Sequence, residues 1–414
     1  MQSENQNRED IDIASETAAP RSILKVILRG GLVAFCAVIF ALGASWVGNK
    51  ADILSPLKQA LDSYKLSDFY FWAHKSSRRV SYNGTSVVTL DISGCHDRME
   101  IAEVINKVNS ANPRVVAIDI VFPDISKYVD KAANDSLVSA LKRTRNLVLA
   151  REYRPLADGK YSINPSFFEN EVDATIGAAT LPIGIIRDWT PVWVLGNDTI
   201  PSLAKAIADV AGIPVSSATS SRIIDYSIND GMIIKANSIW DAECLEDQIV
   251  LIGDMDDLRD SHVIPLTLNR SIKQAGMIIH RQILQTIMQG KERYTVPKWL
   301  VVLVTYLTLW ALFVIKECYK NSGARLRRFL SKSHNRFIAY IIAFYDKIKP
   351  DLLRLAIMCG AIICGYLLLW ATGILFEFKL LMSGYVALYI VEGIDNDITE
   401  FNARMKKTLD DNNK

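Results

Sequence analysis

Four apolar runs limit what this chain can fold into, because an apolar segment of about 20 residues crosses a bilayer as a helix. The runs cover residues 30–48, 299–315, 355–376 and 380–391. The last run is short, so it is also compatible with a tilted or re-entrant segment. A mean hydropathy of +0.14 together with 22% charged residues indicates membrane helices attached to an ordinary globular domain. The predicted membrane helices are residues 22–48, 299–315, 355–376 and 380–394.

The first apolar run has a signal peptide as its rival interpretation, because Arg21, Lys25 and Arg29 resemble the charged start of such a peptide. However, the run is longer than the usual signal-peptide core, and a long polar segment precedes it. The sequence therefore favours an uncleaved helix. Residues 1–21 lack hydrophobic periodicity and are predicted to be a disordered cytoplasmic tail.

The basic segment of residues 316–354 sets the predicted orientation. It holds ten Lys and Arg residues against three acidic residues, and short basic loops stay in the cytoplasm. Four spans then place both termini and this loop in the cytoplasm, with residues 49–298 outside and residues 395–414 as a cytoplasmic tail. Within the loop, residues 336–349 are apolar and aromatic with basic flanks, which fits an interfacial helix or an extension of the next span.

The external segment of residues 49–298 alternates between strand and helix patterns, after a helical start at residues 53–64. Val and Ile runs predict buried strands at residues 85–92, 114–122, 146–150 and 248–252, and an aromatic run predicts a further strand at residues 67–75. Amphipathic patterns predict helices at residues 98–111, 134–145, 201–211 and 274–289. This alternation is typical of an α/β fold with a mainly parallel sheet covered by helices on both faces. The order of the strands within residues 175–235 stays open.

Acidic residues follow the predicted strands at the points where the strands end. Asp91 ends the first buried strand, Asp119 lies late in the second, and Asp254 follows the last. Since ligands of open α/β sheets bind beyond the carboxyl ends of the strands, these carboxylates are predicted to line one site. The loop after the last strand adds four further groups: Asp256, Asp257, Asp260 and His262.

Carboxylates gathered in one cleft repel one another, so a cation, a basic ligand, nearby arginines or water must relieve the repulsion. Arg98, Arg187 and Arg259 are the candidates within the chain. Metal binding, a solvated or helix-capping role, and an organic-ligand or conformational role stay open as alternatives. In this interpretation Asp91 and Asp119 are the more buried members of the group.

The sequence contains no pattern typical of a metal site or of an enzyme. The acidic loop fits a calcium loop at three positions, but Arg259 and Pro265 replace the required glycine and glutamate. A zinc site needs more ligands than His262 provides, and His280 is expected to be structural. The chain has no P-loop, GxSxG, GxGxxG or HExxH motif. No cofactor and no enzymatic activity are therefore predicted, and the net charge of +2 predicts no nucleic-acid partner.

The six cysteines include no CxxC pair. Cys95 follows the carboxyl end of one predicted strand, whereas Cys244 precedes the amino end of another. Parallel strands of about 17–20 Å would hold these residues too far apart for the Cα spacing of about 5.5–6 Å that a disulfide requires. The sequence therefore predicts no disulfide between them.

The external segment contains five sequence stretches in this order: VVTLDIS, RVVAIDIVF, DSLVSALKRTRNLVLA, IVLIGDMDDLRDSHVIPL and AGMIIHRQILQTIMQGK. Together they resemble the type-two CHASE domain, a sensory extracellular domain of bacterial membrane proteins, over about residues 50–295. The layout, with one membrane helix before the domain and three after it, is similar as well. The resemblance implies a multi-pass protein of the bacterial inner membrane, with its sensor domain in the extracytoplasmic space.

The resemblance also implies site positions. Asp91 and Ser93 match the acidic end of the family's first strand, and Asp119 matches the aspartate of its second. Further matches are Asp135, Arg187, Gly253, Asp260, His262, Pro265, Gly276 and His280. Two departures are the stretch GCHDRME in place of a Trp-Pro run and Ile183-Gly184 in place of Asp-Gly. The candidate ligand-binding residues are Asp91, Ser93, Asp119, Arg187, Asp254, Asp260 and His262.

About twenty residues follow the last predicted span, which is too few to fold as the kinase, cyclase or phosphatase domain that family members often carry. The chain is therefore expected to be a sensor or receptor subunit in the lipid bilayer that acts through a separate membrane or cytoplasmic output protein, as a monomer or a homo-oligomer. A structural or assembly subunit of an envelope complex is the alternative function. A metal-dependent hydrolase is a more distant one.

Overall fold

The computed structural model describes residues 23–50, 65–75, 80–123, 130–156, 161–196, 198–228, 231–265, 273–290, 293–330 and 336–412. The chain divides into two compact units. One unit comprises residues 1–62, 296–367 and 376–414, and the other comprises residues 63–295 and 368–375. The predicted tail at residues 1–21 and the predicted helical start at residues 53–64 lie outside the described residues.

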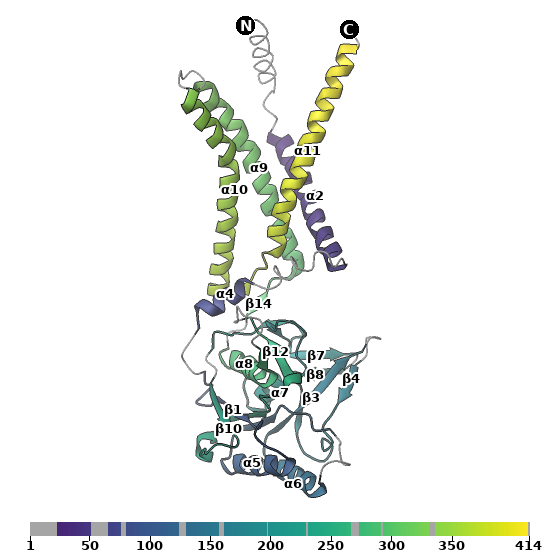
Figure 1. Ribbon diagram of the computed structural model, residues 1–414, viewed down its shortest axis with the longest axis vertical. Coiled ribbons are helices and arrows are strands. Elements are labelled where there is room, and N and C mark those ends of the chain that lie inside the picture. Colours follow the sequence, from purple (N-terminus) through teal and green to yellow (C-terminus); the bar gives the residue numbers. More distant parts are fainter. Residues whose placement is uncertain are drawn as a thin grey trace. The chain divides into compact units, whose positions relative to one another are not determined.

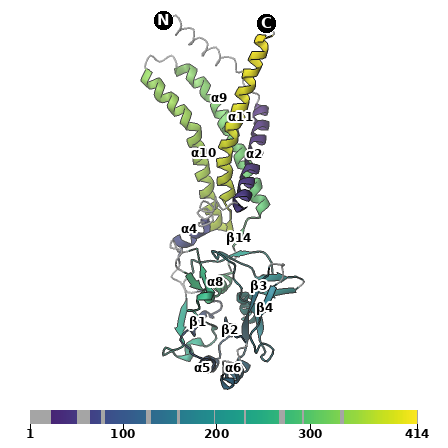
Figure 2. The same cartoon turned by 45° about the vertical axis from the view of Figure 1, so that its right-hand side comes forward.

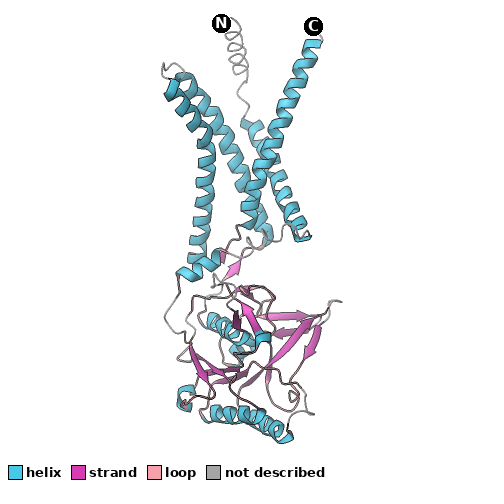
Figure 3. Cartoon of the chain, in the orientation of Figure 1, coloured by secondary structure: helices cyan, strands magenta, loops and turns pink. Residues whose placement is uncertain are grey.

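The first unit consists of long helices, drawn in cyan in Figure 3. They are α2 (Ile23–Lys50), α9 (Lys298–Leu330), α10 (Arg336–Thr372) and α11 (Lys379–Asn412). Within the described residues, three segments are long and apolar enough to cross a membrane: Ile23–Ser45, Lys298–Cys318 and Asp351–Thr372. The fourth predicted span is helical, but Glu392 and Asp395 interrupt its hydrophobicity soon after residue 391.

The predicted cytoplasmic loop of residues 316–354 is largely helical. Helix α9 continues to Leu330, and α10 begins at Arg336 and runs without a break to Thr372. Residues 336–349 are therefore the first turns of the same helix that contains the apolar run, which agrees with an extension of the next span. An independent interfacial helix, the other interpretation of this segment, is not what the structure contains.

The helices of this unit share one apolar core. Small residues of α2, among them Ala34, Ala37 and Ala41, are buried against large side chains of α9 and α11 such as Leu309 and Leu388. Small residues allow helices in a membrane to approach closely, and dispersion contacts then hold them together. The apolar part of α11 is thus an integral member of the helical core.

The second unit is built on one seven-stranded sheet, drawn in magenta in Figure 3. Its strands lie in the order β10-β1-β11-β2-β3-β4, with β5 also paired to β3. All of its pairs are parallel except β3 with β4. The strands are β1 (Val87–Asp91), β2 (Val115–Ile118), β3 (Leu147–Pro155), β4 (Tyr161–Asn164), β5 (Thr175–Ala178), β10 (Met232–Lys235) and β11 (Ile249–Gly253).

Helices cover both faces of this sheet, as Figures 1 and 2 show. One face packs against α5 (Arg98–Ser110) and α6 (Lys131–Lys142), the other against α7 (Leu203–Val210) and α8 (Gly276–Met288). Successive side chains of a strand point to opposite faces. Val88 and Leu90 accordingly join the apolar cluster of α5 and α6, whereas Thr89 accepts a hydrogen bond from Arg281 of α8. The predicted α/β fold with a mainly parallel, doubly covered sheet is confirmed.

Most of residues 67–75, predicted as a strand, lies instead in a helix. Helix α4 (Leu66–Ala73) begins with its Asp68 carboxylate accepting a hydrogen bond from the amide of Lys65 at 2.9 Å. Ser67, Asp68, Tyr70 and Phe71 are buried, so the helix presents one side to the domain. Aromatic residues favour strands only when they pack on a sheet. Here the local cap and the helical spacing of the buried residues determine the outcome.

Between β5 and β10, the segment whose order the sequence left open forms short two-stranded sheets. Strand β6 pairs with β9, and β7 pairs with β8, both antiparallel. Their bounds are β6 (Asp188–Trp189), β7 (Val192–Leu195), β8 (Asp198–Pro201) and β9 (Arg222–Ile223). The remaining pairs are β12 (Ser261–Val263) with β13 (Lys273–Ala275), and β14 (Tyr294–Thr295) with β15 (Ile374–Leu375).

Cys95 and Cys244 are free thiols. The strands that flank them, β1 and β11, are parallel neighbours, as the prediction against a disulfide required. Cys244 is exposed, and its Sγ donates a hydrogen bond to the carbonyl of Asp241.

Candidate functional site

The carboxyl ends of β1, β2 and β11 lie side by side, so the residues that follow them meet at one edge of the sheet. Asp91 is buried there at 4% exposure. It accepts hydrogen bonds from the amide of Ser93 at 3.0 Å, the hydroxyl of Ser93 at 3.1 Å and the amide of Met255 at 3.2 Å. Asp91 and Ser93 therefore join the loop after β1 to the loop after β11, and this carboxylate is satisfied by the chain itself.

Asp119 occupies the adjacent position, just beyond β2, and its amide donates to the carbonyl of Ile252 at 2.8 Å. The residue as a whole is half-buried, but its Oδ2 is enclosed and has no hydrogen-bond partner within the described residues. The enclosed oxygen governs its acidity. Burial raises the pKa of Asp119 to about 6; His280 and His262 lower it, while the carboxylate of Asp260 raises it further. An acid with this pKa changes charge near neutral pH.

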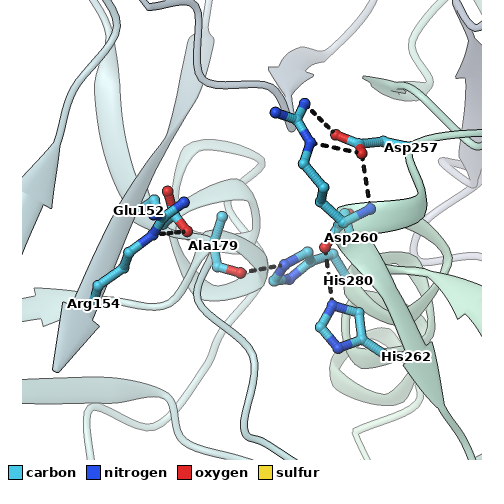
Figure 4. A network of polar contacts seen from close by, with 8 residues as sticks. Glu152, Arg154, Ala179, Asp257, Asp260, His262 and His280 are labelled. Carbon is cyan, nitrogen blue, oxygen red and sulfur yellow. Dashed lines mark hydrogen bonds and ion pairs between the residues drawn. The ribbon is translucent and has the colours of Figure 1, made fainter.

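Asp260 and His262 form a second pair at this edge, visible in Figure 4. The Nε2 of His262 lies 2.9 Å from Oδ1 of Asp260. The Asp260 carboxylate packs on Gly276, the first residue of α8, where an added Cβ would lie 2.4 Å from both carboxylate oxygens. A helix N-terminus attracts negative charge. A side chain at position 276 would displace this carboxylate from the start of α8.

His280 lies one turn further along α8 and is 3% exposed. Its Nε2 donates a hydrogen bond to the carbonyl of Ala179 at 3.0 Å (Figure 4). The other ring nitrogen, Nδ1, is buried and has no partner within the part of the chain that the structure describes. Sequence reasoning took His280 as structural, although its spacing of four residues from Gly276 places both on one face of the helix. That spacing was the signal for its place beside Asp119.

The rest of the acidic loop satisfies itself. Asp254 accepts a hydrogen bond from the amide of Asp256 at 2.8 Å, which is a local turn. Asp257 pairs with Arg259 at 2.9 Å, so Arg259 supplies part of the predicted charge relief. Because both members lie at the surface, this pair contributes little to stability.

The two other arginines proposed to relieve the acidic edge have further partners among the described residues. Arg187 forms a buried ion pair with Asp68 of α4, with an Nη2–Oδ2 distance of 2.7 Å. Arg98 donates to the side chain of Asn134 and to the carbonyl of Pro123. Its guanidinium also lies 4.8 Å from the centre of the Phe167 ring.

The side chains beyond β1, β2 and β11 fit a group that exchanges a proton better than they fit a metal site. Within the described residues, no group of three or more His, Cys, Asp or Glu side chains is arranged to hold a metal ion. Residues 258–260 of the loop that resembled a calcium site form a short 3-10 helix. What remains is a carboxyl group that titrates near neutral pH, with His280, His262 and Asp260 around it. Such a group can change its charge when its surroundings change.

Comparison with known protein families gives one match: the model of the CHASE2 domain matches residues 39–315, more than half of the chain. The matched region includes the whole of the sheet described above and parts of α2 and α9. No curated protein and no solved structure matches the chain at a significant level.

Proposed function

The chain belongs to the CHASE2 family of extracellular sensory domains, and we propose that it is a membrane-bound sensor subunit that passes a signal to a separate output protein. The observation that carries this proposal is the extent of the match, which includes the α/β domain and reaches into the apolar helices on either side of it. A domain connected at both ends to membrane helices can move these helices when its own structure shifts.

Helix α8 supplies a physical connection from the carboxylate edge to the ends of the domain. Its first turn, at Gly276 and His280, borders the edge, and its second half contacts Asp225. The side-chain amide of Gln282 donates to the carbonyl of Asp225 at 2.8 Å, and the hydroxyl of Thr286 accepts from the Asp225 amide at 3.0 Å. A displacement of α8 therefore also displaces the backbone at Asp225.

Asp225 in turn holds the two ends of the domain together. Its carboxylate forms an ion pair with Arg293, which stands five residues before α9 begins. The guanidinium of Arg293 also lies 5.3 Å from the ring centre of Tyr70 and 5.2 Å from that of Phe71, both on α4. The segment that enters the domain and the segment that leaves it thus meet at one arginine. In the proposed mechanism, the signal changes this contact and so the relation between the first two membrane helices.

In the helical unit, ion pairs near residues 392–395 of α11 link this helix to α2, α9 and α10. Glu392 of α11 accepts from Lys316 of α9 at 2.7 Å and from Arg354 of α10 at 3.0 Å. Arg29 of α2 pairs with Asp395 of α11, with an Nε–Oδ2 distance of 2.8 Å. Charged groups among membrane helices are costly unless paired, so these contacts fix the register of α11 against the others. We propose on this basis that α11 is the fourth membrane helix and that it moves together with α2.

The part of α11 beyond this level offers a surface to the output protein. An apolar stripe of exposed side chains follows the helix with spacings of three and four residues: Ile398, Phe401, Met405 and Leu409. Exposed apolar patches of this kind mark interaction sites, and a helix in a groove is read through such a spacing. The proposed output protein binds α11 along this stripe in the cytoplasm.

Partner capture tests the proposed docking surface. Phe401→Gln together with Met405→Gln is expected to reduce recovery of crosslinked cytoplasmic or membrane partners at least tenfold, because two anchors of the stripe lose their apolar contact. In-cell crosslinking followed by quantitative mass spectrometry measures the recovery.

The matched control is Asn402→Gln together with Lys406→Gln, which changes exposed residues next to the same anchors. Glutamine is a good helix former in both variants, so helicity is not the difference between them. Equal loss of partners in both variants, or in neither, would contradict docking along the stripe. Packing between the membrane helices would then be the route to the output protein.

Topology is a second test of the proposal. Cys244 is exposed in the α/β domain and is expected to react in intact cells with a membrane-impermeant maleimide. A cysteine introduced as Ser333→Cys, in the basic segment, is expected to react only after the membrane is permeabilised. Ser333→Cys is made in a chain that also carries Cys244→Ser, and the control chain carries Cys244→Ser alone. Labelling of Ser333→Cys in intact cells would place the basic segment outside and overturn the proposed orientation.

A further inference from the structure

Helix α4 has the reverse of the polarity that is usual for a helix on the surface of a domain. Its buried residues include Ser67 and Asp68, whereas its exposed residues Phe69, Trp72 and Ala73 are all apolar. A helix that faces water normally directs its polar side chains outward. We propose that the exposed side of α4 lies in the surface of the lipid bilayer, with Phe69 and Trp72 as its anchors. This inference goes beyond the proposed sensor function and does not depend on it.

The polar residues of α4 can face the domain because they have partners there. The Asp68 carboxylate pairs with Arg187 at 2.7 Å and accepts a hydrogen bond from the Ser67 hydroxyl at 3.4 Å. On the other side of the helix, Phe69 and Trp72 are 53% and 67% exposed. These two rings lie three residues apart and so share one face of the helix. Neighbouring large apolar side chains that stay exposed indicate a contact outside the domain.

The chain that leaves the domain limits how far α4 can lie from the membrane. The guanidinium of Arg293 lies 5.3 and 5.2 Å from the ring centres of Tyr70 and Phe71 on α4. Arg293 stands five residues before Lys298, where the membrane-spanning segment of α9 begins. Five residues of extended chain reach at most about 18 Å. The residue that packs against α4 is therefore held close to the bilayer surface.

A second membrane-spanning segment ends at the same part of the domain. The amide of Tyr294 in β14 donates to the carbonyl of Gly373 at 3.1 Å, and β14 pairs with β15. Gly373 directly follows the apolar segment Asp351–Thr372. The strand next to Arg293 is thus joined to the ends of two spans. This continuity identifies the bilayer as the occupant of the exposed face of α4.

The residues around these ends have the character of a membrane–water boundary. Trp299 and Trp370, close to the ends of the two spans that meet the domain, are 67% and 62% exposed. Tryptophan is enriched at this boundary, because its ring is apolar and its N–H is polar. In the sequence, the basic residues Lys75, Arg78 and Arg79 follow α4. Apolar rings beside basic residues are typical of helices that bind in the surface of membranes with anionic lipids.

Photocrosslinking of the full chain in lipid vesicles tests the proposal. Trp72→p-benzoylphenylalanine and, in a separate chain, Phe69→p-benzoylphenylalanine each keep an aromatic ring at an exposed position. The vesicles contain phosphatidylcholine and phosphatidylglycerol in equal parts. On irradiation the benzophenone inserts into nearby C–H bonds. The mass spectrum of the intact protein is expected to show the chain plus one phospholipid for both variants.

The matched control is Ile239→p-benzoylphenylalanine, which places the same probe at another exposed apolar residue of the domain. Ile239 lies beside α5, since Lys107 of that helix donates to the carbonyl of the next residue, Trp240, at 2.8 Å. Figures 1 and 2 show α5 and α4 at opposite ends of the α/β domain. This variant is expected to give no phospholipid adduct.

Absence of a phospholipid adduct at either position of α4, or an equal yield at Ile239, would overturn the proposal. A crosslink from Phe69 or Trp72 to a second copy of the chain or to another protein, in place of lipid, would assign this face to protein docking and overturn it as well. The experiment contains no output protein, so its failure is distinct from a failure of partner capture, which tests the proposed relay.

Discussion

Replacing Asp68 with alanine is expected to lower the free energy of unfolding of the α/β domain by about 3–5 kcal/mol. Asp68 and Arg187 are 5% and 8% exposed, and the Nε–Oδ1 and Nη2–Oδ2 contacts measure 2.9 and 2.7 Å. Removing the carboxylate leaves the guanidinium of Arg187 buried and without its counter-charge. Denaturant unfolding of the full chain in micelles, followed by hydrogen exchange in the domain, measures the loss.

The control for this prediction is Asp198→Ala, which removes an exposed acid of β8 and is expected to change stability by less than about 0.5 kcal/mol. The double variant Asp68→Leu with Arg187→Met replaces both charges by apolar groups and is expected to recover most of the loss. A loss below about 1 kcal/mol for Asp68→Ala, or no recovery in the double variant, would show that the ion pair is not a main support of α4.

Replacing Asp119 with asparagine is expected to raise the free energy of unfolding at pH 8, by up to about 3 kcal/mol. The pKa of Asp119 is about 6 in the folded chain and about 3.9 in an unfolded one. Because the folded value is raised, the folded state binds the proton more tightly. The stability from this protonation is fully present below about pH 4 and is lost as the pH rises through about 6. Asparagine cannot ionise, so the variant avoids the cost of burying a charge at pH 8.

Unfolding of the parent and of Asp119→Asn at pH 4, 6 and 8 measures this effect, with the difference expected to grow from near zero to its maximum. Asp256→Asn serves as the control, because Asp256 is an exposed acid of the same edge. The same difference between parent and variant at pH 4 and pH 8 would show that the buried carboxyl does not titrate in this range.

Particular elements show why the sequence predicted the fold well. Strands β1, β2 and β11 consist mostly of Val, Ile and Leu, with Thr89 and Ala117 as the interior exceptions, and all of their residues are buried. Such runs alternate with amphipathic helices only when a parallel sheet is covered on both faces. The three qualifying membrane helices follow in the same way from run length alone.

The elements that sequence reasoning missed are those whose state depends on distant residues. The aromatic residues of α4 carry a strand pattern, but their helix is held through Asp68 by Arg187, 119 positions away. Arg187 could not be excluded from the acidic edge without this partner. A pocket lined by Trp189 and Trp193 likewise gathers residues of β5, β6, β7 and α8, and the order of these strands could not be predicted from the sequence.

The candidate site also combines features that the sequence predicted with features that it could not predict. Asp91, Asp119 and Asp254 were predicted at one edge, because parallel strands bring their carboxyl ends together, and the neighbouring ends of β1, β2 and β11 place them there. The sequence could not predict that these carboxylates have different roles. Asp91 is satisfied by Ser93 and Met255, whereas Oδ2 of Asp119 is enclosed and has no hydrogen-bond partner among the described residues.

By itself, the sequence determined the apolar helices, the parallel α/β core and the edge at which the acids gather, because each depends on local periodicity or on strand direction. Only the tertiary structure decided which carboxylate has an enclosed oxygen without a partner among the described residues, which arginine is already paired, and that the charge of His280 acts on that carboxylate. The physical reason is that desolvation and charge pairing depend on the distances between side chains far apart in the chain, and these distances exist only once the domain has folded.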